Sequence, residues 1–239
     1  MLLSFEQINY TYPCNPKPTL QGLSLQISTG RRYAVIGQNG CGKTTLFRLA
    51  NGLYRPSSGT VRWQGEALSY SRTSLYQLRQ QVGLVFQNPE EQLVAATVEE
   101  DLSYGLCNLK LPDAEIARRV QQTLEAFELT DLADFPVNYL SLGQKKRLAI
   151  ADIMILRPRL LLLDEPTAYL DPGQVRNLRQ MLATIQTEGT TLIIATHNLN
   201  FVQDWADWVI VMNQGQIVME DTPAAIFSRP PFLKAMGLS

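Results

Sequence analysis

The 239-residue sequence predicts a single α/β domain with a parallel sheet and an inserted helical subdomain. Short apolar, β-like runs alternate with helical patterns in residues 1–87 and again in residues 158–239. Between them, residues 88–157 lose the β character and carry helical periodicity. We therefore assign residues 1–87 and 158–239 to the α/β core and residues 88–157 to the subdomain.

The first part of the core contains five predicted strands and one helix. Arg32–Ile36 is a short apolar run that leads into a glycine-rich turn, which is typical of a buried strand. The helix after this turn begins at Lys43 and ends near Leu53, because Asn51-Gly52 is a stop signal. The other strands are predicted at residues 2–10, 23–27, 60–63 and 82–86.

Two helices are predicted in the inserted subdomain. Asp113 follows a proline and is expected to cap the first helix. The apolar side chains of that helix fall on one face, at Ile116, Val120, Leu124 and Phe127. The second helical run, KKRLAIADIMIL, follows the segment LSLGQ, in which Ser141 is suited to cap the first free N–H groups.

The last part of the core returns to alternating strands and helices. Residues 160–163 are a fully apolar strand, residues 172–188 a helix and residues 192–196 another strand. Two further strands, residues 209–212 and 216–219, flank the turn Asn213-Gln214-Gly215 and predict a hairpin.

Composition narrows the possible partners. The formal net charge is −1, so the overall field of the protein gives no reason to expect nucleic acid or acidic lipid. No segment approaches the ~18 to 20 apolar residues that span a bilayer, and the start of the chain does not predict a signal peptide. The three cysteines, Cys14, Cys41 and Cys107, form no paired pattern, which favours reduced thiols in a cytosolic protein.

A phosphate-binding loop is predicted between the strand Arg32–Ile36 and the following helix. The sequence GQNGCGKT matches the pattern G-x-x-x-x-G-K-[ST] in the strand–loop–helix context that the pattern needs. Its glycines let backbone N–H groups point at one anion, and the helix start adds a positive dipole. Its residues are Gly37, Gln38, Asn39, Gly40, Cys41, Gly42, Lys43 and Thr44.

Lys43 and Thr44 indicate the chemistry of this loop. Lys43 supplies a cation for the β- and γ-phosphates of a nucleotide, and Thr44 offers a hydroxyl oxygen to Mg²⁺. A plain glycine-rich turn does not explain why Lys and Thr follow at these positions. Cys41 lies inside the loop, and we expect alkylation of its thiol to block nucleotide binding.

Two carboxylates end the apolar strand at residues 160–163. Asp164 stands where ligands of open α/β sheets bind, and we expect it to hold Mg²⁺. Glu165 is free to accept a proton or to orient a water, which favours hydrolysis over transfer to another acceptor. The alternative is an acidic pair that opens a turn before Pro166, which is a weaker explanation downstream of a phosphate loop.

Two polar residues follow other predicted strands. His197 is the single histidine, and it follows the strand at residues 192–196. A lone histidine is more often structural, but at this strand end we expect it to bond the γ-phosphate. Gln87 follows the strand at residues 82–86, and its amide is suited to contact the metal and the attacking water.

Taken in order, these motifs resemble an ABC-type ATPase, the nucleotide-binding subunit of ATP-binding-cassette transporters. The matching pieces are GQNGCGKT, the glutamine after VGLVF, LSLGQKKR, LLLLDEPTAYLD and the histidine in IIATHN. The resemblance implies a P-loop NTPase core of the RecA-like type, with an N-terminal antiparallel β subdomain. It also implies ATP as the nucleotide, bound with Mg²⁺, and hydrolysis as the reaction.

The resemblance further implies roles for single residues. Tyr12 is similar to the aromatic residue that stacks on adenine, and Thr45 joins the nucleotide contacts of the loop. Gln87 resembles the lid-loop glutamine that couples to a transmembrane partner. Asp171 resembles the aspartate that communicates across a dimer. In this family, two subunits pair head to tail, and the LSLGQ residues Ser141, Gly143 and Gln144 complete the phosphate cage of the partner subunit.

Two residues depart from the family pattern. Leu142 stands where the family usually has glycine, so its side chain must point away from the nucleotide. Tyr169 stands where a small residue is common. Neither departure removes a catalytic group, but both leave open the geometry of dimer closure and the rate of hydrolysis.

Within the family, the segments NPEEQL and TVEEDLSYG resemble the energy-coupling-factor group, whose members drive uptake of cobalt, nickel or vitamins. This implies a peripheral subunit on the cytoplasmic face of the cell membrane, with integral membrane subunits as partners. A soluble ATPase in cofactor assembly is the alternative; a scaffold without turnover conflicts with the intact motifs. The transported substrate, the direction of transport and the choice between homodimer and heterodimer stay open.

Overall fold

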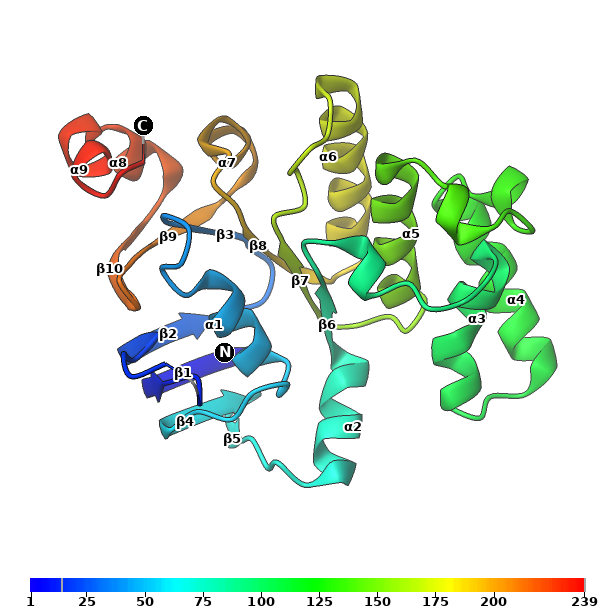
Figure 1. Ribbon diagram of the computed structural model, residues 1–239, viewed down its shortest axis with the longest axis horizontal. Coiled ribbons are helices and arrows are strands. Elements are labelled where there is room, and N and C mark those ends of the chain that lie inside the picture. Colours follow the sequence, from blue (N-terminus) through cyan, green and yellow to red (C-terminus); the bar gives the residue numbers. More distant parts are fainter. Residues whose placement is uncertain (14, 239) are drawn as a thin grey trace.

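The computed structural model describes residues 1–13 and 15–238, so Cys14 and Ser239 lie outside the described residues. Two sheets and a set of helices form the molecule (Figure 1). The helices α3 (Val98–Asn108) and α4 (Asp113–Ala126) lie at the opposite end of the molecule from α8 (Pro223–Phe227) and α9 (Pro230–Ala235). The predicted α/β fold with a helical subdomain is confirmed.

A six-stranded central sheet runs in the order β10-β9-β3-β8-β7-β6. All of its neighbouring strands are parallel except the β9–β10 hairpin. Because helices and a second sheet cover both faces, β3, β7 and β8 read as continuous apolar runs. The strands are β3 (Arg32–Ile36), β6 (Val82–Val85), β7 (Leu160–Asp164), β8 (Thr191–Ala195), β9 (Trp208–Asn213) and β10 (Gln216–Asp221).

The four-stranded second sheet is the predicted N-terminal antiparallel subdomain. Its strand order is β2-β1-β4-β5. Along β2, buried and exposed side chains largely alternate, as expected for an antiparallel sheet with one face in the core. Gly22 has a left-handed φ of 58°, and the register shifts close to it. The strands are β1 (Leu3–Tyr10), β2 (Leu20–Ile27), β4 (Ser58–Trp63) and β5 (Glu66–Ala67).

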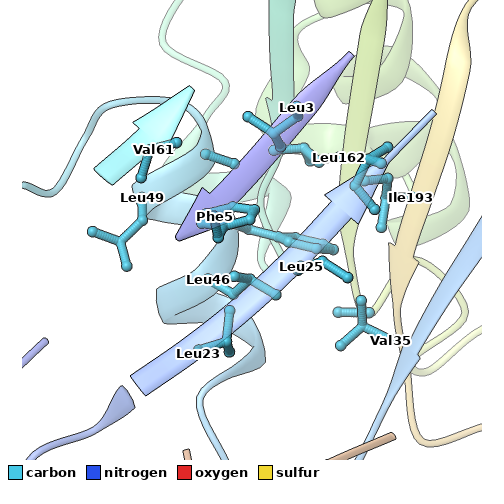
Figure 2. Close-up of a cluster of buried hydrophobic side chains, with 14 of the residues drawn as sticks. Leu3, Phe5, Leu23, Leu25, Val35, Leu46, Leu49, Val61, Leu162 and Ile193 are labelled. Atoms are coloured by element: carbon cyan, nitrogen blue, oxygen red, sulfur yellow. The ribbon is translucent and has the colours of Figure 1, made fainter. Parts of the chain in front are cut away.

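The helix α1 (Lys43–Ala50) shares one buried cluster with both sheets, as Figure 2 shows. Leu46 and Leu49 of α1 pack with Phe5 and Leu25 of the antiparallel sheet and with Leu162 of the central sheet. Each fully buried side chain of this size contributes roughly 1.5 to 3 kcal/mol. This cluster therefore fixes the first residues of α1, where phosphate is expected to bind.

The opposite face of the central sheet packs on a second set of helices. Alternate residues of the same strands, such as Leu161 and Leu163, join this cluster, as the two-residue period of a strand requires. The helices are α5 (Leu142–Met154), α6 (Pro172–Thr187), α7 (Leu199–Trp205), α8 and α9.

The helical subdomain has a core of its own, formed by α3, α4, α5 and the 3₁₀ turns η2 (Thr130–Leu132) and η3 (Val137–Tyr139). The predicted apolar face of α4 is confirmed, since Val120 and Leu124 are buried there. The prediction that Asp113 caps α4 was wrong. Pro112 is the cap residue in extended conformation, so Asp113 lies inside the first turn, where its charge faces the helix dipole instead.

Several elements were not predicted. These are α2 (Arg72–Gln81), α3, β5, the 3₁₀ turns η1 (Pro89–Glu91), η2 and η3, and the helices α7, α8 and α9. The last three have five to seven residues, which is too short for a helical period to emerge. In addition, α1 ends at Ala50, with Asn51 as its C-cap, before the predicted Leu53. Within residues 1–13 and 15–238, no helix has the length and apolarity to cross a bilayer.

Candidate active site

A cleft of about 810 Å³ lies at the carboxyl edge of the central sheet. The ends of β3, β6, β7 and β8 deliver the predicted residues to it, because parallel strands all end at one edge. The predicted residues that line it are Tyr12, Asn39, Gly40, Gly42, Lys43, Thr44, Thr45, Gln87, Asp164, Glu165 and His197. Asn15, Thr19, Ala168 and Tyr169 also line it and were not predicted to do so.

The loop before α1 has a backbone that needs glycine. Gly40 and Gly42 have left-handed φ values of 79° and 109°. A side chain at Gly37 would collide with the carbonyl of Met212 and with the thiol of Cys41. The N-cap Gly42 offers no side-chain bond, and the first turn of α1 has no acidic residue. The first N–H groups of α1 therefore remain available to an anion.

Lys43 and Cys41 are buried within this loop. Lys43 Nζ donates to the carbonyl oxygens of Gly37 at 2.7 Å and Gln38 at 3.2 Å, so the loop itself holds the ammonium group. Burial raises the pKa of the Cys41 thiol, although the charge of Lys43 opposes this shift. A buried thiol with a raised pKa reacts slowly with alkylating reagents. Alkylation of Cys41 is therefore expected to need high reagent concentration or long incubation before it blocks nucleotide binding.

Thr44 and Asp164 form the candidate metal position. Thr44 Oγ1 donates to Asp164 Oδ2 at 2.6 Å. Burial raises the pKa of Asp164, while the Thr44 hydroxyl and the nearby cations Lys43 and Arg48 oppose that shift. Two hard oxygen donors in contact, one of them a desolvated carboxylate, fit Mg²⁺, which takes its remaining ligands from phosphate and water. Gln87 lines the same cleft, where its amide oxygen is available as a further ligand.

Glu165 and His197 form a contact pair beside this position. His197 Nδ1 lies 2.9 Å from Glu165 Oε2, and the backbone N–H of His197 donates to the same oxygen at 3.3 Å. Glu165 is buried, whereas the His197 ring is exposed to the cleft. The carboxylate is therefore held in one orientation by its neighbour, and Nε2 on the far side of the ring is left to meet a substrate.

Tyr12 reaches the cleft from the antiparallel sheet. Its hydroxyl lies 3.0 Å from Thr45 Oγ1, and its ring packs edge-on against Tyr10 and Tyr54. These contacts fix the ring next to α1. Stacking of Tyr12 on adenine stays a prediction.

The LSLGQ segment does not line the cleft of its own chain. Ser141 caps α5 and Gln144 caps it in return: Gln144 N donates to Ser141 Oγ at 3.3 Å and Ser141 N to Gln144 Oε1 at 2.8 Å. Asp171 caps α6 in the same way, accepting from Gly173 N and Gln174 N. A side chain at Gly143 would meet the amide of Gln174, so the starts of α5 and α6 are in close contact. The structure thus separates Ser141, Gly143, Gln144 and Asp171 from the other predicted site residues.

Sequence reasoning missed Lys146, which is buried on α5 and contacts the backbone after Glu165. The run Lys145-Lys146-Arg147 was available as a signal, because three consecutive basic residues on an otherwise apolar helix cannot all face solvent.

Residues 20–168 match the family model described as ABC transporter. A putative ABC transporter ATP-binding protein of Nostoc sp. strain PCC 7120 is 60% identical over 237 residues, covering 99% of this chain and 86% of that protein. The energy-coupling factor transporter ATP-binding protein EcfA3 of Clostridium perfringens is 40% identical over 238 residues, covering 99% and 83%. The solved structure of CbiO1 from Clostridium perfringens, part of the ABC transporter complex CbiONQ, has a TM-score of 0.87 at 39% identity, covering 99% and 94%.

Proposed function

We propose that this chain drives a membrane importer of the energy-coupling-factor type. The chain belongs to the ABC transporter family and is an ATPase of that family, which is the premise of the proposal. The observation that carries the chemical part is the meeting of two contacts at one sheet edge. These are the Thr44–Asp164 contact at 2.6 Å and the His197–Glu165 contact at 2.9 Å. These contacts support a metal position at Thr44 and Asp164 beside an oriented carboxylate, in the cleft that Lys43 also lines.

The proposed mechanism assigns one task to each of these residues. The free N–H groups of α1 and the ammonium of Lys43 bind the phosphates of ATP, for which Lys43 leaves the carbonyls of its own loop. Thr44 and Asp164 would hold Mg²⁺, which would neutralise phosphate charge there. Glu165 takes a proton from the attacking water, and His197 keeps the carboxylate in position.

We further propose that two cassettes pair head to tail, each completing the site of the other. The support is that Ser141, Gly143 and Gln144 lie outside the cleft of their own chain, at the start of α5, where Ser141 is exposed and the other two are half-buried. A helix start with a serine cap is suited to phosphate, and a second chain brings it to the cleft. ATP then holds the pair together, and hydrolysis releases it.

The membrane partner is proposed to dock near Gln87, on the cytoplasmic face of the cell membrane. Three exposed apolar side chains lie on neighbouring segments: Tyr76 on α2, Val94 after η1 and Tyr104 on α3. The hydroxyl of Tyr76 donates to Asn108 O at the end of α3, so α2 and α3 meet there. Exposed apolar residues of this kind are typical of interaction surfaces. The imported substrate is proposed to be cobalt, nickel or a vitamin.

Recovery of the tagged chain from its own cells tests the transport role. We expect an integral membrane protein to copurify after mild detergent extraction. Tyr104→Lys should reduce this recovery, while Val218→Lys on β10, which also changes an exposed apolar residue, should not. Recovery with soluble proteins alone would reject the importer and favour a role in cofactor assembly.

The hydrolytic role of Glu165 has a separate test. Glu165→Gln removes the base but keeps the contacts of the phosphates, so we expect turnover to fall about 100-fold or more and a pair of chains with bound ATP to accumulate. Rapid turnover in this variant, measured as phosphate release, would reject Glu165 as the base.

A further inference from the structure

Lys146 is a buried cation whose partners are all backbone atoms. Its side chain comes from α5, and the residue is 7% exposed. Nζ donates to three carbonyl oxygens, those of Glu165 at 3.2 Å, Pro166 at 3.1 Å and Ala168 at 2.8 Å. These acceptors belong to one short segment, residues 165–169, directly after β7. Lys146 thus ties the helix that begins with LSLGQ to the backbone of the catalytic carboxylate.

This segment has a strained residue at each end. Glu165 has a φ of 47° and Tyr169 a φ of 62°, both in the left-handed region that favours glycine. Such residues persist only where the surrounding structure holds them. The three bonds from Lys146 fall between the two strained positions, so they are placed to hold this conformation.

The far end of the segment presents an aromatic ring to solvent. Tyr169 is 87% exposed, and it stands on the rim of the ATP cleft. Together with Leu142 at the start of α5, it also lines an adjoining cleft of about 300 Å³ that contains Gln87. An exposed ring contributes little to the stability of the single chain, so the ring itself does not offset the strained backbone at Tyr169. A second molecule that covers the ring would add to the hold that Lys146 gives this segment.

The identity of that molecule follows from what the ATP cleft lacks. The cleft contains the phosphate loop, the metal position and the base, but Ser141 and its neighbours lie outside it. A second copy of this chain that brings its own Ser141 to the cleft must approach the rim on which Tyr169 stands. This step rests on the head-to-tail pairing proposed above.

We propose that Lys146 is a positioning residue that fixes segment 165–169 and so transmits the contact between Tyr169 and a second copy of the chain to the carboxylate of Glu165. Because φ of Glu165 sets the direction of its side chain, relaxation of the segment would move the carboxylate from its 2.9 Å contact with His197. ATP is held by the loop and by Lys43, which this movement does not touch. The turnover number should therefore fall while KM for ATP stays.

Steady-state hydrolysis by the full chain tests this proposal. Lys146→Met removes the three bonds and is expected to lower kcat at least tenfold, with KM for ATP within twofold of the wild type. Lys145→Gln is the matched control, since Lys145 is the adjacent lysine on α5 and pairs with Glu90 at 2.7 Å. It should change neither constant more than twofold. A folded Lys146→Met protein with wild-type kcat would overturn the proposal.

Tyr169 supplies a test that does not depend on a buried residue. Tyr169→Gly relieves the left-handed strain, so the melting temperature should not fall, yet kcat should drop at least fivefold. ATP-dependent pairing, measured by light scattering in a Glu165→Gln background, should weaken at least tenfold with Tyr169→Gly. Tyr169→Phe, which retains the ring, should stay within threefold. Equal pairing by the Gly and Phe variants would overturn the role of Tyr169.

The double variant decides whether the two residues act through one segment. Lys146→Met combined with Tyr169→Gly should lose no more than twofold beyond the larger single loss, whereas multiplied losses would contradict a shared path. If Lys146→Met does not fold, Lys146→Gln replaces it. A Glu165→Gln protein that stays monomeric with ATP would reject head-to-tail pairing itself. Normal ATP-dependent pairing of the Glu165→Gln protein, together with wild-type kcat in the Lys146 variant, would reject only the role proposed for Lys146.

Discussion

Two helix starts in this protein are suited to phosphate, and they are prepared for it differently. The N-cap of α1 is Gly42, which lines the cleft and has no side chain to bond the first N–H groups of the helix in the single chain. The N-cap of α5 is Ser141, which lies outside the cleft and forms a reciprocal cap with Gln144. A free helix start gains the full benefit of an anion, whereas a capped one must exchange existing bonds for new ones. The affinity of one chain for ATP is therefore expected to come from α1, and α5 contributes only when two chains meet.

The largest expected effect concerns the α1 side of this comparison. Lys43→Ala removes the cation that the loop holds at 2.7 Å from Gly37 O, and we expect the affinity of the monomer for ATP to fall at least 100-fold. Fluorescence of a labelled ATP analogue measures this affinity. Lys145→Gln is a suitable control because Lys145 is also a lysine but lies outside the cleft and pairs with Glu90. Wild-type affinity in Lys43→Ala would show that α1 is not the main phosphate site.

The next effect concerns the α5 side. Ser141→Arg should leave the affinity of the monomer for ATP within twofold, because Ser141 does not line its own cleft. The same change should abolish ATP-dependent pairing, since a bulky cation stands where the partner's phosphates are expected. Ser141→Ala gives the smaller loss of a helix cap, about 1 kcal/mol of stability, and separates the two effects. Loss of ATP binding by the Ser141→Arg monomer would mean that the starts of α1 and α5 bind the same ATP within one chain, which contradicts head-to-tail pairing.

The same contrast shows what the sequence can predict. The contents of the cleft were predictable because Lys43, Asp164 and His197 each follow an apolar strand, and parallel strands end at one edge. The capping pair at α5 was predictable in full, because Ser141 and Gln144 have the S-x-x-Q spacing of a capping box, although only the cap by Ser141 was predicted. Lys146 and Tyr169 were not predictable as partners in one segment, because their link runs through backbone carbonyls that no residue pattern reveals.

Asp113 illustrates a different reason for failure. Its position after Pro112 allowed two helix starts that differ by a single residue. Proline in extended conformation took the cap position, and the aspartate entered the first turn. Local signals of this kind place a helix but do not fix its first residue.

The smallest expected effect is on the pH dependence of stability, because the cores that pack beneath α1 and α5 differ in their buried carboxylates. α1 rests on an apolar cluster, whereas the inner side of α5 carries Asp152 close to Asp101 of α3. Asp101 is 2% exposed; its Oδ1 accepts from the N–H groups of Val94 and Ala95, and its Oδ2 has no protein partner among the described residues. Burial, followed by the charge of Asp101, raises the pKa of Asp152 to about 7, although a bond from Gln92 opposes this.

A raised pKa gives stability that is present at low pH and lost as pH rises. In the unfolded chain Asp152 ionises near pH 4, so between pH 4 and 7 the native state binds more protons, and the free energy of unfolding falls with rising pH. From pH 5 to pH 8 the wild type should lose on the order of 2 kcal/mol through this residue. Asp152→Asn should remove that part of the slope in urea unfolding, while Asp134→Asn, at an exposed position, should retain it. An unchanged slope in Asp152→Asn would show that Asp152 does not contribute to the pH dependence of stability, contrary to this prediction.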